Sequence, residues 1–427
     1  MSYSAPQPCR HESRFFTHHE WVDVEAFIRG LDDIPDGIHS IGLGSGYHLD
    51  IMLKDRPLDP AHGTAAVFFS GAVSKRPEKT PPFLSGANVA KGVRIPLISI
   101  ADPTLTADED LGLGWYVGPR GVDVHGAIRR AVRAMLDVSG NEFWLVGGSG
   151  GGFAALRTAQ AVGSGCNALV WNPQTSILDY YANSVKKFLA AAYPEVSYQL
   201  DDTHWKEAAA KALREDGVVH SLPEYCGDGL RFDRLIYLQN WDDWHARNHA
   251  VPFFRATGMR QLQPGVFGTD DSHLIWITEV GKGHAPPAPE TVQQLLTSAA
   301  YDIRQPRAVV DWHLMSGTFP AQRTSEYLMD LREVAGAVER AIKFTYTDGH
   351  KITPASAVLG KTFGGLRFRY ELVHGSQTFQ TKLAPLASTY VVPSDGQAWD
   401  HVRVVVLDGF DHALFETVFL NQSLETA

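Results

Sequence analysis

The stretch Asn141–Thr158, with the sequence NEFWLVGGSGGGFAALRT, decides how this chain is expected to fold. It begins with an apolar run of aromatic and branched residues, which is typical of a buried strand, and it ends with residues that helices accept. Between these parts lie six residues, of which five are glycine and one is Ser149. The stretch therefore predicts a strand, a very tight turn and a helix, with one serine side chain projecting from the turn.

Residues 147–151, GGSGG, match the pattern G-x-S-x-G, which presents a nucleophilic serine at the end of a strand. Glycines two positions before and after the serine let strand and helix approach closely, and the start of the helix leaves unpaired amide groups beside it. The dinucleotide pattern G-x-G-x-x-G fails, because Phe153 occupies its last position when it starts at Gly148. The phosphate-loop pattern fails too, since no Gly-Lys-Ser or Gly-Lys-Thr follows. A purely structural glycine turn is the alternative.

The composition is that of a globular protein with more than one domain, since 427 residues exceed what one hydrophobic core usually serves. A net charge of −10 argues against nucleic acid or an anionic membrane as the main partner. Cys9, Cys166 and Cys226 lie far apart and offer neither a disulfide framework nor paired metal ligands, which favours a reducing compartment. No signal-peptide pattern and no run of 18 apolar residues occurs, so a cytoplasmic location is expected.

The hydrophobic pattern changes along the chain and predicts four parts. Residues 1–37 read as an N-terminal arm. Residues 38–300 alternate strands with helices, which predicts a mostly parallel, doubly wound α/β sheet, with a helical insertion at about 179–228. Residues 301–340 form a connecting segment. Residues 341–427 contain short strands between turn formers, which predicts a small all-β sandwich of immunoglobulin-like type, suited to binding, docking or self-association.

Candidate partners for the serine follow two later strands. Asp242 and Asp243 come after an apolar strand that ends at Gln239, at the edge where open parallel sheets form their sites. We prefer Asp243 as the carboxylate that orients a histidine, with Asp242 as the alternative. His284 lies on a glycine-flanked loop after the last core strand, whereas its rival His273 precedes that strand and belongs at the opposite edge. The order serine, acid, histidine is the one expected of a single fold.

Two backbone amides are expected to stabilise the negative oxygen of a tetrahedral intermediate. One is the amide of Gly150, which follows the serine, and the other is the amide of Ala72, after the buried strand Thr64–Ser70. An ordinary strand-ending glycine is the alternative at Gly71. Residues 74–92 are rich in proline, lysine and glycine and could form a roof over the site.

Two further features bear on ligands. The loop Leu111–Gly118 combines glycines with aromatic residues, and such loops either stack on sugars and planar groups or pack inside a protein. His245 and His249 are four residues apart, but the glutamate of H-E-x-x-H is absent, since Ala246 follows His245. We therefore expect no metal and no organic cofactor.

Over residues 38–300 the chain resembles the α/β-hydrolase superfamily, on the serine turn and on the loop GKGHAPP at residues 281–287. The resemblance implies that Ser149 is the nucleophile, His284 the general base and then acid, and Asp243 its orienting carboxylate. The oxyanion loop departs from the family, because it reads Ser-Gly where many members have His-Gly, which leaves the second amide donor open. A fainter likeness connects the chain with bacterial surface-polysaccharide and accessory-secretion proteins that have the same core.

These features predict a serine hydrolase that cleaves a carboxylic ester through an acyl-enzyme, without metal or cofactor. A small-molecule or carbohydrate ester is the expected substrate, and an acyl or acetyl ester on a carbohydrate is favoured because of the aromatic loop and the appended sandwich. The alternatives are a peptidase or amidase that uses the same three residues, and a glycan-binding or assembly protein whose hydrolase core has no turnover.

Overall fold

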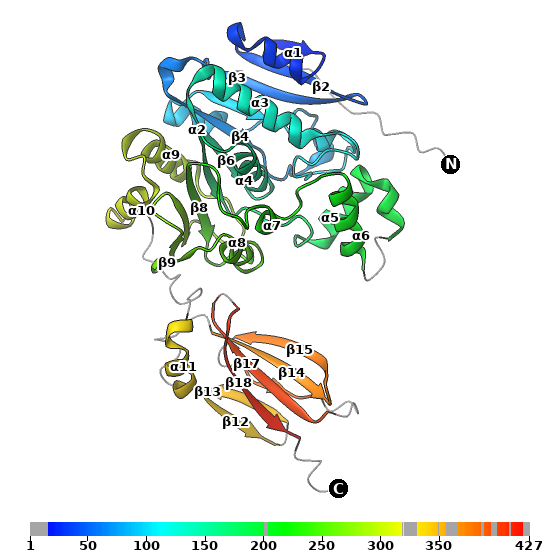
Figure 1. Ribbon diagram of the computed structural model, residues 1–427, viewed down its shortest axis with the longest axis vertical. Coiled ribbons are helices and arrows are strands. Elements are labelled where there is room, and N and C mark those ends of the chain that lie inside the picture. The colour runs from blue at the N-terminus through cyan, green and yellow to red at the C-terminus, as the bar shows by residue number, and fades with distance from the viewer. Residues whose placement is uncertain are drawn as a thin grey trace. The chain divides into compact units, whose positions relative to one another are not determined.

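The computed structural model divides the chain into two units: Met1–Met259 with Phe267–Pro320, and Arg260–Val266 with Ala321–Ala427. Figure 1 shows helices around a large sheet in the first unit and strands with one short helix in the second. Much of the predicted arm, residues 1–15, and part of the predicted connecting segment, residues 320–330, lie outside the described residues. The structure describes residues 16–199, 204–317, 319, 331–348, 350–355, 366–385, 388–393, 399–409 and 411–421.

Eleven strands form one sheet in the order β1-β2-β3-β5-β4-β6-β7-β8-β11-β10-β9. Strand β3 is antiparallel to both β2 and β5, while β5, β4, β6, β7, β8 and β11 are parallel neighbours. The prediction of a mostly parallel sheet is thereby confirmed. The strands are β1 His18–Trp21, β2 Gly37–Gly44, β3 Tyr47–Lys54, β4 Thr64–Phe69, β5 Leu97–Ile100, β6 Glu142–Gly148, β7 Cys166–Trp171, β8 Arg234–Asn240, β9 Arg260–Gln263, β10 Val266–Gly268 and β11 His273–Thr278.

Helices cover both faces of this sheet. Helix α2 joins β4 to β5, and α3 joins β5 to β6, which lies on the other side of β4. Because crossovers between parallel strands are right-handed, α2 and α3 lie on opposite faces. Helix α4 packs against α3, and α9 packs against α2. The helices of this unit are α1 Val24–Arg29, α2 Ala87–Val93, α3 Val124–Ser139, α4 Gly150–Val162, α5 Ala182–Ala192, α6 Trp205–Glu215, α7 Leu222–Tyr225, α8 Val251–Ala256, α9 Pro289–Thr297 and α10 Pro306–Met315.

The sequence explains why β6 and α4 form at the centre. All side chains from Phe143 to Val146 are fully buried, since β6 has neighbours on both sides and helices on both faces. Helix α3, which leads the chain to β6, begins where the Asp123 carboxylate accepts the N–H of Gly126, and it ends at Gly140 with φ 63°. Helix α4 is buried from Gly150 to Gln160, which its run of small residues permits.

The second unit is an antiparallel β domain, as predicted. Its sheets have the orders β12-β13-β16 and β15-β14-β17-β18. Inward side chains of both sheets, among them Ile352, Phe368, Tyr370, Tyr390 and Val404, share one buried core. The elements are α11 Ala335–Ala341, β12 Lys343–Thr347, β13 Lys351–Ala355, β14 Arg367–His374, β15 Gln377–Pro385, β16 Tyr390–Val391, β17 His401–Leu407 and β18 Ala413–Leu420.

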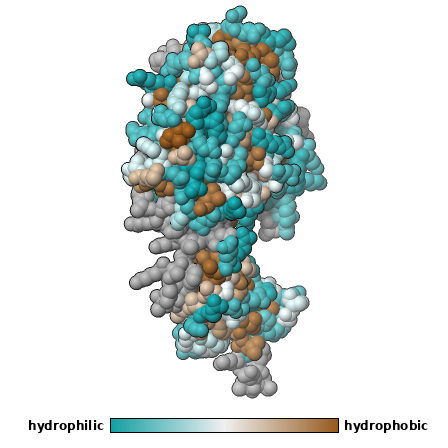
Figure 2. Space-filling model, turned by 60° about the vertical axis from the view of Figure 1, so that its left-hand side comes forward, coloured by the Kyte–Doolittle hydropathy of each residue, from teal (hydrophilic) through white to brown (hydrophobic). Residues whose placement is uncertain are grey.

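The face of the molecule in Figure 2 has the mixed surface that is usual for globular proteins. Hydrophilic side chains cover most of it, and hydrophobic ones lie in small separate groups. Within the described residues, no helix combines the length and the apolar character that a membrane span requires.

Candidate active site

Ser149 lies in the predicted turn between β6 and α4, with φ 54° and ψ −122°. This backbone conformation is costly for a serine and is held by its neighbours. The Ser149 N–H donates to the Trp171 carbonyl at 3.1 Å, and the Ser149 carbonyl accepts the N–H of Gln174 at 3.1 Å. A Cβ at Gly147 would lie 2.5 Å from the carbonyl carbon and oxygen of Gly151, so the glycine spacing is required for the close approach of strand and helix.

The structure brings the three predicted side chains of the candidate triad together. The Nε2 atom of His284 lies 3.0 Å from the Ser149 hydroxyl oxygen, and its Nδ1 atom lies 2.7 Å from Oδ2 of Asp243. The Asp243 side chain is fully buried, whereas that of His284 is one-third exposed. The residues follow β6, β8 and β11, whose carboxyl ends meet at one edge of the sheet.

Asp242 and His273, the alternatives to Asp243 and His284, make other contacts. Asp242 accepts hydrogen bonds from the Asn240 side chain and from the Gly283 N–H, the latter at 2.8 Å. It thereby holds the loop that carries His284. His273 lies at the start of β11, where its ring contacts the Phe232 carbonyl at 2.8 Å, far along the strand from the carboxyl edge.

The surroundings keep Asp243 ionised. Burial by itself raises the pKa of this carboxyl, but hydrogen bonds from His284 and from the His245 N–H, together with two nearby imidazoles, bring the pKa below its ordinary value. The carboxylate is placed to accept the Nδ1–H of His284, and Nε2 then faces the Ser149 hydroxyl.

Two further histidines lie behind His284 in the interior. The ring of His245 lies 4.1 Å from that of His284 and 4.5 Å from that of His249, measured between centroids. Burial and the neighbouring His284 lower the pKa of His245 to about 4, although Asp243 and a hydrogen bond to the Asn172 carbonyl raise it. Burial and His245 likewise lower the pKa of His249 to about 3. Both rings are therefore neutral near pH 7.

Three of these groups could in principle hold a metal ion. Potential ligand atoms of Asp243, His245 and His284 lie within 4.8 Å of one another. In the observed arrangement, however, His284 is hydrogen-bonded through both ring nitrogens, to Asp243 and to Ser149. A metal at His284 would displace one of these hydrogen bonds, so the metal-free assignment stays our prediction.

Gln174 is a site residue that the sequence interpretation missed. Its Nε2 atom donates to the Ser149 hydroxyl oxygen at 3.0 Å, and its Oε1 atom accepts the indole N–H of Trp115. Because an indole nitrogen can only donate, the Trp115 contact fixes which end of the amide faces the serine. Gln174 follows Pro173 just after β7, the neighbour of β6, and this position at the carboxyl edge was the available signal.

The aromatic loop packs inside the protein, which corrects the idea of a sugar-stacking surface. Trp115 is 0% and Tyr116 is 1% exposed, so neither ring can receive a ligand. The Tyr116 hydroxyl accepts the Ser70 N–H at 2.6 Å and donates to the Ile100 carbonyl at 3.1 Å. These residues support Gln174 and the oxyanion loop instead of binding a substrate.

The candidate oxyanion loop lies against the serine turn. A Cβ at Gly71 would be 3.1 Å from the Gly148 carbonyl oxygen and 3.8 Å from the Ser149 Cβ, so this glycine allows the approach. Within the part of the chain that the structure describes, the N–H groups of Ala72 and Gly150 donate to no protein acceptor. Both amides thus keep the capacity to bind an oxyanion.

A cavity of about 710 Å³ opens in front of these groups. It is lined by Ser149, His284 and Ala72, by Trp171 and Tyr180, and by part of the predicted roof, including residues 82–86. The candidate triad therefore faces a space large enough for a small-molecule substrate.

Comparisons with known proteins give only distant structural similarity. No protein-family model matches the chain, and no curated protein matches it. Among solved structures, the capsule O-acetyltransferase of Neisseria meningitidis serogroup A aligns over 63% of this chain and 96% of its own, with 15% identity and a TM-score of 0.42. An S-formylglutathione hydrolase from Agrobacterium tumefaciens aligns over 65% and 94%, with 12% identity and a TM-score of 0.38. An esterase from Thermogutta terrifontis aligns over 67% and 96%, with 12% identity and a TM-score of 0.37.

The chain's own topology settles the fold class. The G-x-S-x-G turn joins a central parallel strand to a buried helix, and the acid and the histidine follow later strands in that order. The first unit therefore has the fold of the α/β-hydrolase superfamily.

Proposed function

We propose that the protein hydrolyses a carboxylic ester through an acyl-enzyme intermediate formed on Ser149. The observation that carries this proposal is the continuous hydrogen-bonded chain from the Ser149 hydroxyl through His284 to Asp243, with distances of 3.0 Å and 2.7 Å. Such a chain makes a serine hydroxyl of ordinary acidity reactive, because the imidazole accepts its proton during attack and the carboxylate stabilises the resulting cation.

In the first half-reaction the Ser149 oxygen attacks the ester carbonyl carbon while Nε2 of His284 takes the hydroxyl proton. The amides of Ala72 and Gly150 bind the negative oxygen of the tetrahedral intermediate, a contribution of about 3 kcal/mol for one such donor. His284 then protonates the departing alcohol oxygen as the carbon–oxygen bond breaks. In the second half, His284 takes a proton from water, the hydroxide attacks the acyl-enzyme, and the carboxylic acid leaves as the proton returns to Ser149.

The chemical identity of the alcohol part of the substrate stays a prediction. Two features of the sequence favour a carbohydrate, and the first of them, the aromatic loop, no longer supports it because Trp115 and Tyr116 are buried. The other is the appended β domain, for which docking or self-association is our proposal. Peptide or amide cleavage uses the same residues, but an amine leaves less readily than an alcohol and needs more help from the general acid.

A fluorophosphonate probe tests the proposal, since it reacts with activated serines. We expect stoichiometric labelling of the folded protein and none of Ser149→Ala. Ser164→Ala is the matched control, because this exposed serine lies two residues beyond the end of α4 and outside the cavity. Far-UV circular dichroism checks that each variant is folded. A folded wild-type protein that the probe leaves unlabelled would contradict the proposal and favour a binding protein without turnover.

A further inference from the structure

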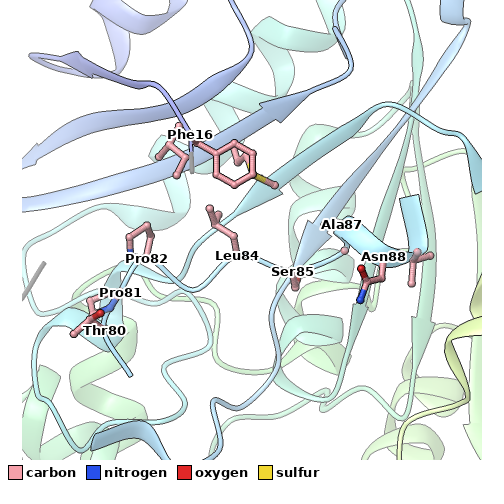
Figure 3. A pocket seen from close by; sticks show the side chains of 12 residues that line it. Phe16, Thr80, Pro81, Pro82, Leu84, Ser85, Ala87 and Asn88 are labelled. Carbon is pink, nitrogen blue, oxygen red and sulfur yellow. The ribbon is translucent and has the colours of Figure 1, made fainter. Parts of the chain in front are cut away.

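A second cavity, of about 540 Å³, adjoins the one that contains Ser149. The two cavities share five lining residues, Pro82, Leu84, Ser85, Gly86 and Val89, all on the segment that forms the roof and the start of α2. Figure 3 shows the second cavity, with the Leu84 side chain extending from this segment toward Phe16. One short segment of chain thus borders both the serine cavity and the second cavity.

The lining of the second cavity is uncharged. Its accessible apolar side chains include Phe16 before β1 and Leu84 on the shared segment, whereas Ile38 on β2 and Met52 on β3 border it but are only 0% and 3% exposed. None of its described lining residues is Asp, Glu, Lys or Arg. In the serine cavity, Lys79 is the single residue of these four types among the described lining residues. Thr80, Ser85 and Asn88 add polar but uncharged groups to the lining of the second cavity. The exposed apolar part of that lining can bind hydrocarbon, because burial removes both partners from water.

Residues in or directly after two neighbouring strands, β4 and β5, hold the shared segment in place. Ser70 donates its hydroxyl to the Phe83 carbonyl at 3.1 Å, and the Ser85 N–H donates to the Ser99 hydroxyl at 2.9 Å. Gly86 is pressed on the Phe68 ring so closely that a Cβ there would lie 2.2 Å from a ring carbon. The surface between the cavities is therefore a preformed one, on which a bound chain can lie without first ordering the loop.

We propose that the two cavities together bind an ester that carries an unbranched apolar chain, with the ester group at Ser149 and the chain lying over Leu84 toward Phe16. This inference rests on the proposed function and names its substrate class. The chain belongs either to the acyl group or to the alcohol, and the chemistry of recognition is the same in both cases. Specificity for a bare acetyl ester would leave the second cavity without a role.

Two series of substrates separate these sources. One keeps nitrophenol as the alcohol and lengthens the acyl group from acetate to dodecanoate; the other keeps acetate and lengthens an unbranched alcohol. In one series kcat/KM should rise by up to about fourfold per added methylene until the second cavity is filled, which is the gain expected from burying a methylene group. The series that shows the rise identifies the side of the ester that carries the chain. A flat or falling kcat/KM in both series overturns the inference.

Variants of the second cavity provide the structural control. Ala87→Trp places a large ring at its exposed mouth, and Asn88→Asp places a charge at an exposed residue that lines the second cavity but not the serine cavity. Both should reduce kcat/KM for the long substrates at least tenfold and change it less than threefold for nitrophenyl acetate. The matched control is Ala61→Trp, an equally large change at an exposed alanine of the short helix Pro60–His62, which lines neither cavity. Equal losses for short and long substrates, or a loss in the control, overturn the inference.

Different experimental results would contradict this inference and the proposed function. If Ser149 reacts with a small fluorophosphonate but chain length has no effect, the inference is wrong and the hydrolase stands. If Ser149 does not react at all in folded protein, the proposed function is wrong and the inference falls with it.

Discussion

The hydroxyl oxygen of Ser149 lies between two side-chain nitrogens, Nε2 of Gln174 and Nε2 of His284, each at 3.0 Å. The Gln174 nitrogen donates to the oxygen, so the hydroxyl proton is left to point at His284. Gln174 is completely buried and anchored by Trp115, which makes it a rigid support. We therefore propose that Gln174, which lies outside the candidate triad, orients the Ser149 hydroxyl toward His284.

Replacement of Gln174 by leucine tests this positioning role. The variant keeps most of the volume but removes the donor to Ser149 and leaves the Trp115 N–H without its acceptor. We expect kcat to fall by about tenfold with little change in KM, which corresponds to one hydrogen bond of about 1.4 kcal/mol lost in the transition state. Steady-state kinetics with nitrophenyl esters measure the split. Recovery toward wild type in Gln174→Asn is not expected, because the shorter side chain cannot reach both partners; an unchanged kcat in Gln174→Leu would show that the contact is incidental.

The loop that carries His284 is an element without regular structure, and side chains from two strand ends hold it. Asp242 accepts the Gly283 N–H at 2.8 Å, the Asn240 side chain donates to the Gly283 carbonyl at 2.7 Å, and the Asn172 side chain donates to the Ala285 carbonyl at 3.2 Å. These bonds flank His284 on both sides. The position of the imidazole therefore depends on the loop being fastened to β7 and β8.

The two neighbouring aspartates should respond differently to substitution. Asp242→Ala removes an anchor of the loop, and we expect about a tenfold loss of kcat/KM, which Asp242→Asn should largely restore because its amide oxygen still accepts the Gly283 N–H. Asp243→Asn should instead cost about 10⁴-fold in kcat, because the amide favours the wrong tautomer of His284. Steady-state kinetics compare the three variants. If Asp242→Asn lost about 10⁴-fold in kcat while Asp243→Asn stayed active, the assignment of the acid would be reversed.

For the whole molecule, the two buried histidines beside the site should make the free energy of unfolding depend on pH. His245 and His249 have folded-state pKa values of about 4 and about 3, below the ordinary 6.5, chiefly because burial disfavours their charged forms. Between these values and pH 6.5 the unfolded chain binds more protons than the folded one. The free energy of unfolding should therefore be complete above about pH 6.5 and fall as the pH drops toward 3 to 4.

His249→Gln should weaken this dependence. The glutamine oxygen can replace His249 Nδ1 as acceptor of the Thr175 N–H, and the variant has no proton to gain on unfolding. Between pH 7 and pH 4 it should lose on the order of 3 kcal/mol less unfolding free energy than the wild type. Urea unfolding at several pH values measures this, with His62→Gln, a change at an exposed histidine, as the control. Parallel pH profiles of the wild type and His249→Gln would contradict the expectation.

The sequence by itself determined the features that depend on neighbours along the chain. Apolar β6, the glycines around Ser149 and the helix after it form one local pattern, and the alternation of strands and helices predicted the parallel sheet. The positions of Asp243 and His284 could also be predicted, because each residue comes after a strand and the carboxyl ends of parallel strands meet at one edge of the sheet.

Only the tertiary structure decided the contacts between distant segments. Trp115, which anchors Gln174, is 59 residues away from it, and Gly283, whose N–H Asp242 accepts, is 41 residues from Asp242, so no local pattern could reveal either contact. Trp115 and Tyr116 have the same sequence pattern whether a ligand or the protein itself covers them; their exposed fractions of 0% and 1% follow from the packing of the chain. Burial and long-range pairing are properties of the assembled fold, because each depends on which surfaces meet after the chain has closed on itself.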